Sequence, residues 1–146
     1  MKSHNGDQIQ VVDGSLRVPN SPVIPYIRGD GIGPEILNTA IGVIDSASEV
    51  AYEGERKIFW METVAGESAF KSLGEWLPEE TLNSIRHHTV ALKGPMTTPV
   101  GVGIRSLNVA IRQSLDLYAC VRPCRWIRGT PAPVRNPEAV DVVIFR

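Results

Sequence analysis

The chain has 146 residues and a formal net charge of −1 at pH 7, with 42% hydrophobic and 21% charged residues. This composition is that of a globular domain and excludes a disordered chain, a collagen-like rod and a coiled coil. There is no run of about 18 apolar residues and no apolar stretch at the N-terminus, so neither a membrane span nor a signal peptide is predicted. Two cysteines are too few for a disulfide framework, which favours the cytoplasm.

The N-terminal part predicts a hairpin followed by a strand and a long helix. The Asp-Gly pair at 13–14 stands between two short β-prone runs, which is typical of a hairpin with a type I′ turn. Residues 23–27 predict a strand, and residues 28–33 predict a glycine-rich turn leading to Pro34 at the first position of a helix. Apolar residues at three- and four-residue steps extend this helix to about Tyr52.

The middle of the chain continues this alternation. Residues 57–64 predict a strand, and a helix is expected to start near Pro78, with acidic residues in its first turn and two histidines in its last. Residues 89–93 predict a buried strand, and a ten-residue loop rich in Gly, Pro and Thr follows at 94–103. A loop of that size in a small domain is usually functional or disordered.

The C-terminal part predicts a helix at 106–115, a strand at 117–121 and a last strand in the apolar run 140–145. Strands that alternate with helices favour an α/β fold with a largely parallel sheet. No turn or helix follows the last run, which suggests that the sequence is a piece of a longer protein.

The glycines of the turn at 28–33 partly match the dinucleotide-binding fingerprint. Gly29, Gly31 and Gly33 lie between a predicted strand and a helix, where backbone N–H groups can approach a phosphate. Pro34 occupies the position of the last glycine of that fingerprint, and no clear strand-end acid follows. A tight turn that packs the helix onto the sheet is therefore the favoured alternative.

The predicted helix at 106–115 has the outline of an anion site. Ser106 is a candidate N-cap, and Arg105, Asn108 and Arg112 share the polar face. The predicted core stripe consists of Leu107, Ala110, Ile111, Ser114 and Leu115. From position 105 onward the chain has seven arginines and only three acids, and arginine binds carboxylate and phosphate in a bidentate manner. An ordinary capped amphipathic helix with a solvated polar face is the alternative.

Other binding chemistries are not favoured. Cys120 and Cys124 lie in an extended segment, where four residues span roughly 13 Å, so the two thiols are not expected to hold one metal ion. The sequence pI of about 6.3 argues against a nucleic-acid partner.

Three longer segments resemble one family. Residues 23–33, 93–113 and 116–123 closely resemble the bacterial NADP-dependent isocitrate dehydrogenases of the isocitrate/isopropylmalate dehydrogenase family. The resemblance covers essentially the whole chain and corresponds to the N-terminal third of such an enzyme. It implies an α/β fold with an incomplete large αβα domain at 1–117 and the start of the small domain at 118–146.

The resemblance also implies an activity. Enzymes of this kind oxidise and decarboxylate isocitrate to 2-oxoglutarate in the tricarboxylic acid cycle, using NADP and Mg²⁺ or Mn²⁺. A cytoplasmic homodimer is implied for the full-length enzyme. The family's catalytic tyrosine and lysine and its metal-binding aspartates would lie beyond position 146, so no catalytic or metal residue is assigned here and the chain alone is expected to be inactive.

The site residues follow from matching positions in the family motif. Thr97 would contact the cofactor, and the serine at position 106 would be a phosphorylation site, as in some bacterial relatives. The residues implied to bind isocitrate are Ser106, Asn108, Arg112, Arg122 and Arg146. Two alternatives stay open: a non-catalytic truncated paralogue that binds or regulates an intact dehydrogenase, and another β-decarboxylating dehydrogenase.

Overall fold

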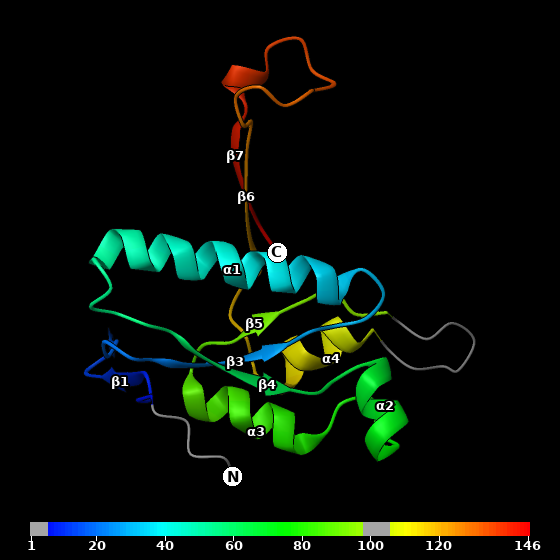
Figure 1. The fold of residues 1–146 in the computed structure, drawn as a ribbon. Coiled ribbons are helices and arrows are strands. Elements are labelled where there is room, and N and C mark those ends of the chain that lie inside the picture. The colour runs from blue at the N-terminus through cyan, green and yellow to red at the C-terminus, as the bar shows by residue number, and fades with distance from the viewer. Residues whose placement is uncertain (1–5, 98–105) are drawn as a thin grey trace. The chain divides into compact units, whose positions relative to one another are not determined.

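The computed structural model describes residues 6–97 and 106–146 (Figure 1). Its contacts divide the chain into two compact units, Met1–Leu115 and Asp116–Arg146. Each unit is described by itself below. The expected domain bounds of 1–117 and 118–146 stay a prediction.

A three-stranded parallel sheet lies at the centre of the first unit. Strand β3 (Val23–Ile27) pairs on one side with β4 (Phe59–Thr63) and on the other with β5 (Leu92–Lys93), both in the parallel sense. Burial alternates along β3, and Val23, Pro25 and Ile27 are its buried residues. The predicted strands at 23–27 and 57–64 are confirmed, the second one with shorter bounds.

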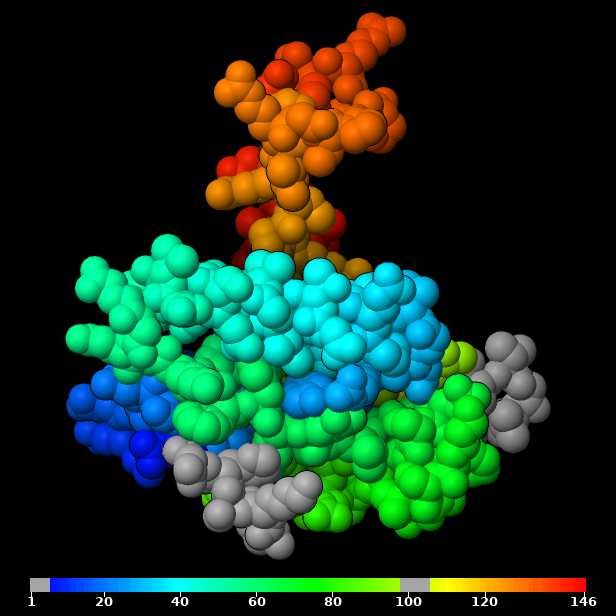
Figure 2. Space-filling view, viewed as in Figure 1, coloured from blue at the N-terminus to red at the C-terminus, as the bar shows by residue number. Residues whose placement is uncertain are grey.

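Helices cover both faces of this sheet (Figure 1). Helix α1 (Gly33–Tyr52) covers one face, while α3 (Glu79–His88) and α4 (Leu107–Ser114) lie on the other. In the space-filling view α1 forms a continuous outer surface of this unit (Figure 2). All three helices were predicted close to these bounds. A fourth helix, α2 (Glu67–Leu73), was missed by the sequence analysis.

The core lies between the sheet and the α3–α4 layer. Its buried cluster consists of Ile27, Ala65, Leu82, Met96, Leu107 and Ile111. Two of these residues belong to α4, so burial of apolar surface fixes the helix that carries the predicted polar face.

The predicted N-terminal hairpin is confirmed. Strands β1 (Gln10–Val12) and β2 (Ser15–Arg17) pair in the antiparallel sense. The two turn residues, Asp13 and Gly14, have φ angles of 51° and 75°. Two successive positive φ angles define the type I′ turn, which explains why Asp-Gly is favoured there.

The predicted buried strand at 89–93 is wrong in its length and burial. Only Leu92–Lys93 pairs with β3, with Leu92 half-buried and Lys93 exposed. Residues 89 and 90 instead finish α3: the Thr89 N–H donates to the Ile85 carbonyl at 3.0 Å and the Val90 N–H to the His88 carbonyl at 2.8 Å. Backbone groups used for this helix end are not available to a sheet.

The second unit is an antiparallel hairpin. Strand β6 (Val121–Arg125) pairs with β7 (Asp141–Phe145), and a short 3-10 helix, η1 (Pro137–Ala139), precedes β7. The last predicted strand is confirmed, but the strand predicted at 117–121 is wrong. The observed strand begins at Val121, so residues 117–120 lie outside it, although two backbone hydrogen bonds of 2.8 and 3.0 Å still pair Cys120 with Arg146.

The hairpin exposes apolar side chains on both of its faces. Val143 and Phe145 are 47% and 71% exposed on one face, and Val142 and Ile144 are 50% and 48% exposed on the other. Successive strand residues point to opposite faces, so this unit has no buried side of its own. Its ten strand residues are all exposed.

A polar cluster joins β3, β4 and α1. The Arg28 guanidinium donates to both carboxylate oxygens of Glu62, at 2.7 and 3.0 Å, and to the Asn38 side-chain oxygen at 3.1 Å. The Tyr26 hydroxyl also donates to Glu62, at 3.1 Å. The hydrogen bonds from Arg28 hold the pKa of Glu62 below its ordinary value of 4.5, and they outweigh the opposing effect of partial burial.

This cluster predicts an acid-dependent contribution to stability. Because the pKa of Glu62 is lowered on folding, the stabilisation is present above the ordinary pKa and is lost as the pH falls through the lowered one. The Glu62→Gln variant should lose only about 0.5–1 kcal/mol of unfolding free energy at pH 7, since the pair is solvent-exposed. Urea unfolding should show this loss shrinking towards pH 3. A loss of equal size at both pH values would contradict the assignment.

Candidate functional site

One buried carboxylate joins three loops at the carboxyl ends of the parallel strands. Asp30, in the turn after β3, is 7% exposed. Its Oδ1 accepts the Glu67 N–H and its Oδ2 accepts the Thr97 N–H, each at 2.9 Å. Its own N–H donates to the Pro95 carbonyl at 2.8 Å. The loops that follow β3, β4 and β5 therefore meet at Asp30, at the edge where ligands bind in α/β folds. We call this arrangement the Asp30 junction.

Glycines allow these loops to approach each other closely. A Cβ added at Gly29 would lie 1.9 Å from the Pro95 carbonyl oxygen, and one at Gly94 would lie 2.1 Å from the Arg28 carbonyl oxygen. A Cβ at Gly66 would lie 2.5 Å from the Asp30 Oδ2. Any side chain at these positions would force the loops apart. The turn at 28–33 thus fits a tight packing turn better than a phosphate cradle.

Two positive charges lie beside the junction. The Lys93 ammonium donates to the Gly94 carbonyl at 2.6 Å. Desolvation and the nearby Arg112 guanidinium both lower the pKa of Lys93, and the Asp30 carboxylate opposes them. Lys93 was not predicted as a site residue, because it lies 19 positions from Arg112 in the sequence and comes near it only in the folded chain.

Helix α4 presents three of the predicted substrate-binding residues. Ser106 occupies the N-cap position, and its carbonyl accepts the N–H groups of Val109 and Ala110 at 2.8 and 2.9 Å. The predicted N-cap position of Ser106 is therefore confirmed, although its side chain makes no capping hydrogen bond to the helix. Asn108 is half-buried and Arg112 is exposed, which places both outside the core.

The predicted core stripe of α4 is correct only in part. Leu107 and Ile111 are buried, Leu115 packs against the core, and Ala110 is half-buried. Ser114 is exposed, and its carbonyl accepts a hydrogen bond from Arg86 at 2.9 Å. Its assignment to the core stripe is therefore wrong. Arg105, predicted for the polar face, lies outside the described residues, as does the loop from position 98 onward.

The remaining two predicted residues lie on one face of the hairpin. Arg122 stands opposite Ile144, and Arg146 stands opposite Cys120. Strand alternation puts Arg122 and Arg146 on the same side, and the Arg122 Nε–H donates to the Cys120 sulfur at 3.4 Å. The structure thus groups Ser106, Asn108 and Arg112 in one unit and Arg122 with Arg146 in the other. That the two groups share one site stays a prediction.

Comparison with known proteins identifies the family. The model of the isocitrate/isopropylmalate dehydrogenase family matches residues 23–146. The chain belongs to the isocitrate/isopropylmalate dehydrogenase family. This result confirms the resemblance and the α/β fold class predicted from the sequence.

Relatives in this family are close to the chain in sequence and structure. The chain is 60% identical over 131 residues to the NADP isocitrate dehydrogenase of Staphylococcus aureus strain Mu50, covering 90% of this chain and 31% of that protein. It is 58% identical over 144 residues to the enzyme of that name from Pseudomonas aeruginosa, covering 97% and 34%. A crystal structure of isocitrate dehydrogenase from Methylococcus capsulatus matches with a TM-score of 0.72 and 41% identity, over 84% of this chain and 33% of that one. The chain therefore spans about a third of the length of the curated relatives it matches.

The described residues of this isocitrate/isopropylmalate dehydrogenase chain hold no metal centre. Within 6–97 and 106–146, no group of three or more His, Cys, Asp or Glu side chains could hold a metal ion. Over the same residues, no helix is long and apolar enough to cross a membrane.

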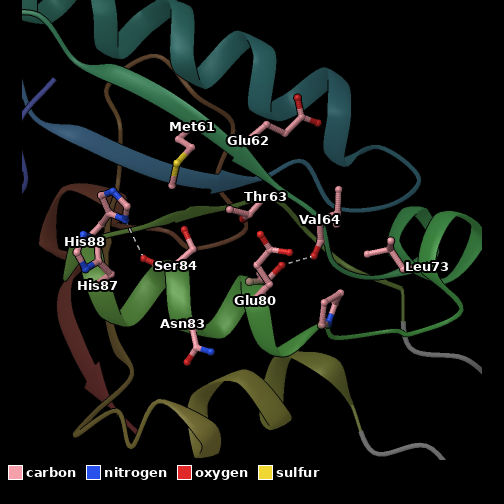
Figure 3. A pocket seen from close by; sticks show the side chains of 12 residues that line it. Met61, Glu62, Thr63, Val64, Leu73, Glu80, Asn83, Ser84, His87 and His88 are labelled. Atoms are coloured by element: carbon pink, nitrogen blue, oxygen red, sulfur yellow. Dashed lines mark hydrogen bonds between the residues drawn. The ribbon is translucent and has the colours of Figure 1, made fainter. Parts of the chain in front are cut away.

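A cavity of about 470 Å³ lies between β4 and α3 (Figure 3). Met61 and Thr63 line it from the strand, and Ser84 and His88 line it from the helix. The Ser84 hydroxyl oxygen is buried and makes no hydrogen bond within the described part of the chain. No residue assigned from the family motif lines this cavity, so it is not part of the candidate site.

Proposed function

We propose that this chain supplies the substrate-carboxylate-binding part of an NADP-dependent isocitrate dehydrogenase. The reaction oxidises isocitrate at its hydroxyl carbon and releases the β-carboxylate to give 2-oxoglutarate, a step of the tricarboxylic acid cycle. The observation that supports this most strongly is the 58% identity over 97% of the chain to an enzyme of that name. The polar side of α4, which joins a hydroxyl, an amide and a guanidinium, agrees with it.

Isocitrate carries three carboxylates, and the chain offers two kinds of group for them. The Ser106 hydroxyl and the Asn108 amide donate to one carboxylate at the N-terminus of α4, where the helix dipole favours an anion. The guanidinium groups of Arg112, Arg122 and Arg146 bind the other two, since arginine donates two parallel hydrogen bonds to a carboxylate. The positive charge of Lys93 beside Arg112 adds to this field.

The nicotinamide cofactor and the metal ion of the family need different groups from this chain. Thr97 contacts NADP in this proposal, and its backbone position is set by the Asp30 junction. The Mg²⁺ or Mn²⁺ of the family does not fit the described residues, because these contain no group of ligands for it. We therefore assign no metal ligand among residues 6–97 and 106–146.

The proposal extends to assembly and control. A homodimer in the cytoplasm is the expected state of the full-length enzyme, and Ser106 is its phosphorylation site. A phosphate there would add about two negative charges where the substrate carboxylate binds.

A chimeric enzyme tests the function. In this chimera the chain replaces the matching third of the Pseudomonas aeruginosa enzyme, with which it aligns over 144 residues. The purified chimera should form NADPH in the presence of isocitrate and a divalent metal ion, whereas the purified 146-residue chain should form none. NADPH absorbance measures both.

Three results would overturn parts of this proposal. NADPH formation by the isolated chain would show that its own residues complete the catalytic machinery. A folded chimera that prefers isopropylmalate would point to another β-decarboxylating dehydrogenase. A folded chimera that oxidises neither substrate would favour the non-catalytic alternative.

A further inference from the structure

The Asp30 junction carries an inference about cofactor binding. Among the described residues, the buried polar ones are Asp30 and Thr81. The Thr81 hydroxyl donates to the Val64 carbonyl at 2.6 Å, 17 positions earlier in the chain. Asp30 instead reaches two segments that lie 37 and 67 positions further along the chain.

Both oxygens of the Asp30 carboxylate are used for backbone N–H groups. Oδ1 accepts a hydrogen bond from the N–H of Glu67, the first residue of α2, and Oδ2 accepts one from the N–H of Thr97, each at 2.9 Å. A buried carboxylate is costly unless it is hydrogen-bonded, and hydrogen bonds to a charged acceptor are stronger than those between neutral groups. The hydrogen bond from the Thr97 N–H to the Asp30 carboxylate is therefore a strong local constraint on the backbone at Thr97.

The segment 94–97 is held from the same turn by further contacts. The Asp30 N–H donates to the Pro95 carbonyl at 2.8 Å, and the Gly94 N–H donates to the Ile27 carbonyl at 2.8 Å. The absence of a Cβ at Gly29 leaves room for the Pro95 carbonyl. The turn after β3 thus sets the position of the backbone that carries Thr97.

We propose that Asp30 is a positioning residue for NADP: its carboxylate fixes the Thr97 backbone so that the Thr97 side chain meets the cofactor. This inference rests on the function proposed above and on the role of Thr97 in it. Asp30 is buried and acts through Thr97. Its loss should weaken NADP binding more than isocitrate binding.

The Asp30→Asn variant of the chimera tests the inference. The amide has nearly the same size as the carboxylate, but only one of its two terminal atoms accepts a hydrogen bond. One buried N–H, of Thr97 or of Glu67, then faces an NH₂ group and loses its partner. We expect the KM for NADP to rise about tenfold, with the KM for isocitrate changed less than about twofold. Titration of NADP into the chimera without isocitrate should show the same weakening of the dissociation constant.

Glu62→Gln is the matched control. It makes the same change from acid to amide in the same unit, but Glu62 contacts Arg28 and Tyr26 and none of residues 94–97. This control should lower the thermal stability slightly and leave both KM values unchanged. This control therefore distinguishes the effect of a general loss of stability from the effect of a displaced backbone at residues 94–97.

A second variant keeps the test decisive if Asp30→Asn does not fold. In Gly66→Ala the new Cβ would lie 2.5 Å from the Asp30 Oδ2, at a φ of 79° that favours glycine, so the carboxylate or the backbone at position 66 must move while the chemistry of Asp30 is unchanged. The KM for NADP should again rise selectively. Equal rises in both KM values, or no rise in either variant, would overturn the inference. Loss of isocitrate oxidation in the unsubstituted chimera would instead count against the proposed function, and the NADP titration would still test the role of Asp30.

Discussion

The Ser106→Asp chimera is expected to lose about a thousandfold in kcat/KM for isocitrate. In the proposed site the Ser106 hydroxyl donates to a substrate carboxylate, so an aspartate there would place two negative charges about 4 Å apart. At a partly exposed site this repulsion is worth about 4 kcal/mol, or about three powers of ten. The loss should fall as the salt concentration rises, since salt screens exposed charges. Steady-state kinetics at two ionic strengths measures both effects.

The charge can be separated from the size of the new side chain. Ser106→Asn has nearly the size of the aspartate variant without its charge, and loss of one hydrogen bond should cost it only about tenfold. Aspartate at an N-cap position is favourable for a helix, so α4 should remain folded and the thermal melting temperature should not fall. Equal kinetics for the aspartate and asparagine variants would show that Ser106 does not face the substrate.

The second large effect is expected at Arg122. In the proposed site, glutamine at this position would remove a charged partner of a substrate carboxylate, which should cost about 3 kcal/mol, or roughly a hundredfold in kcat/KM for isocitrate. The change lies on an exposed strand, so the stability of the enzyme should vary little. Kinetics with isocitrate varied at saturating NADP, together with a thermal melt, measures both.

The chain offers a matched control for Arg122. Arg125 lies three positions further along β6, so its side chain points to the opposite face of the hairpin. It forms an exposed ion pair with Asp141 at 2.8 Å, and its side chain is 72% exposed. Arg125→Gln should therefore leave kcat/KM within about twofold, because an exposed ion pair contributes little. Similar losses in both variants would show that the charge of the hairpin matters and not the particular face.

Local patterns predicted much of the fold. The Asp-Gly turn at 13–14, Pro34 at the start of α1 and the charged ends of α3 are signals carried by neighbouring residues, and the structure confirms each of them. Helix α2 was missed because its seven residues are too few to show a helical period. Strand β6 was misplaced because its bounds follow from pairing with β7, which no local pattern reveals.

The candidate site shows the same division. Ser106, Asn108 and Arg112 were assigned from a motif resemblance, and the structure places Ser106 at the N-cap of α4 and the other two within that helix. Asp30 was not assigned a role, because its partner Thr97 is 67 positions away in the sequence. Lys93 was missed for a related reason: Arg112 lies on α4 and comes near Lys93 only in the folded chain.

The exposure of both faces of the hairpin in the second unit affects the affinity that the proposed site can have for a substrate. A two-stranded ribbon without a buried side is marginally stable in water, so its backbone amides should exchange with solvent rapidly. Arg122 and Arg146 stand on this ribbon, and ordering them around a ligand carries an entropic cost each time one binds. If a protein surface covered the exposed side chains of Val143 and Phe145, the ribbon would already be ordered in the folded protein. Ligand binding would then no longer carry this entropic cost. In the proposed site, affinity for the substrate would then depend on Val143 and Phe145, which lie on the opposite face from the two arginines and would not touch the substrate.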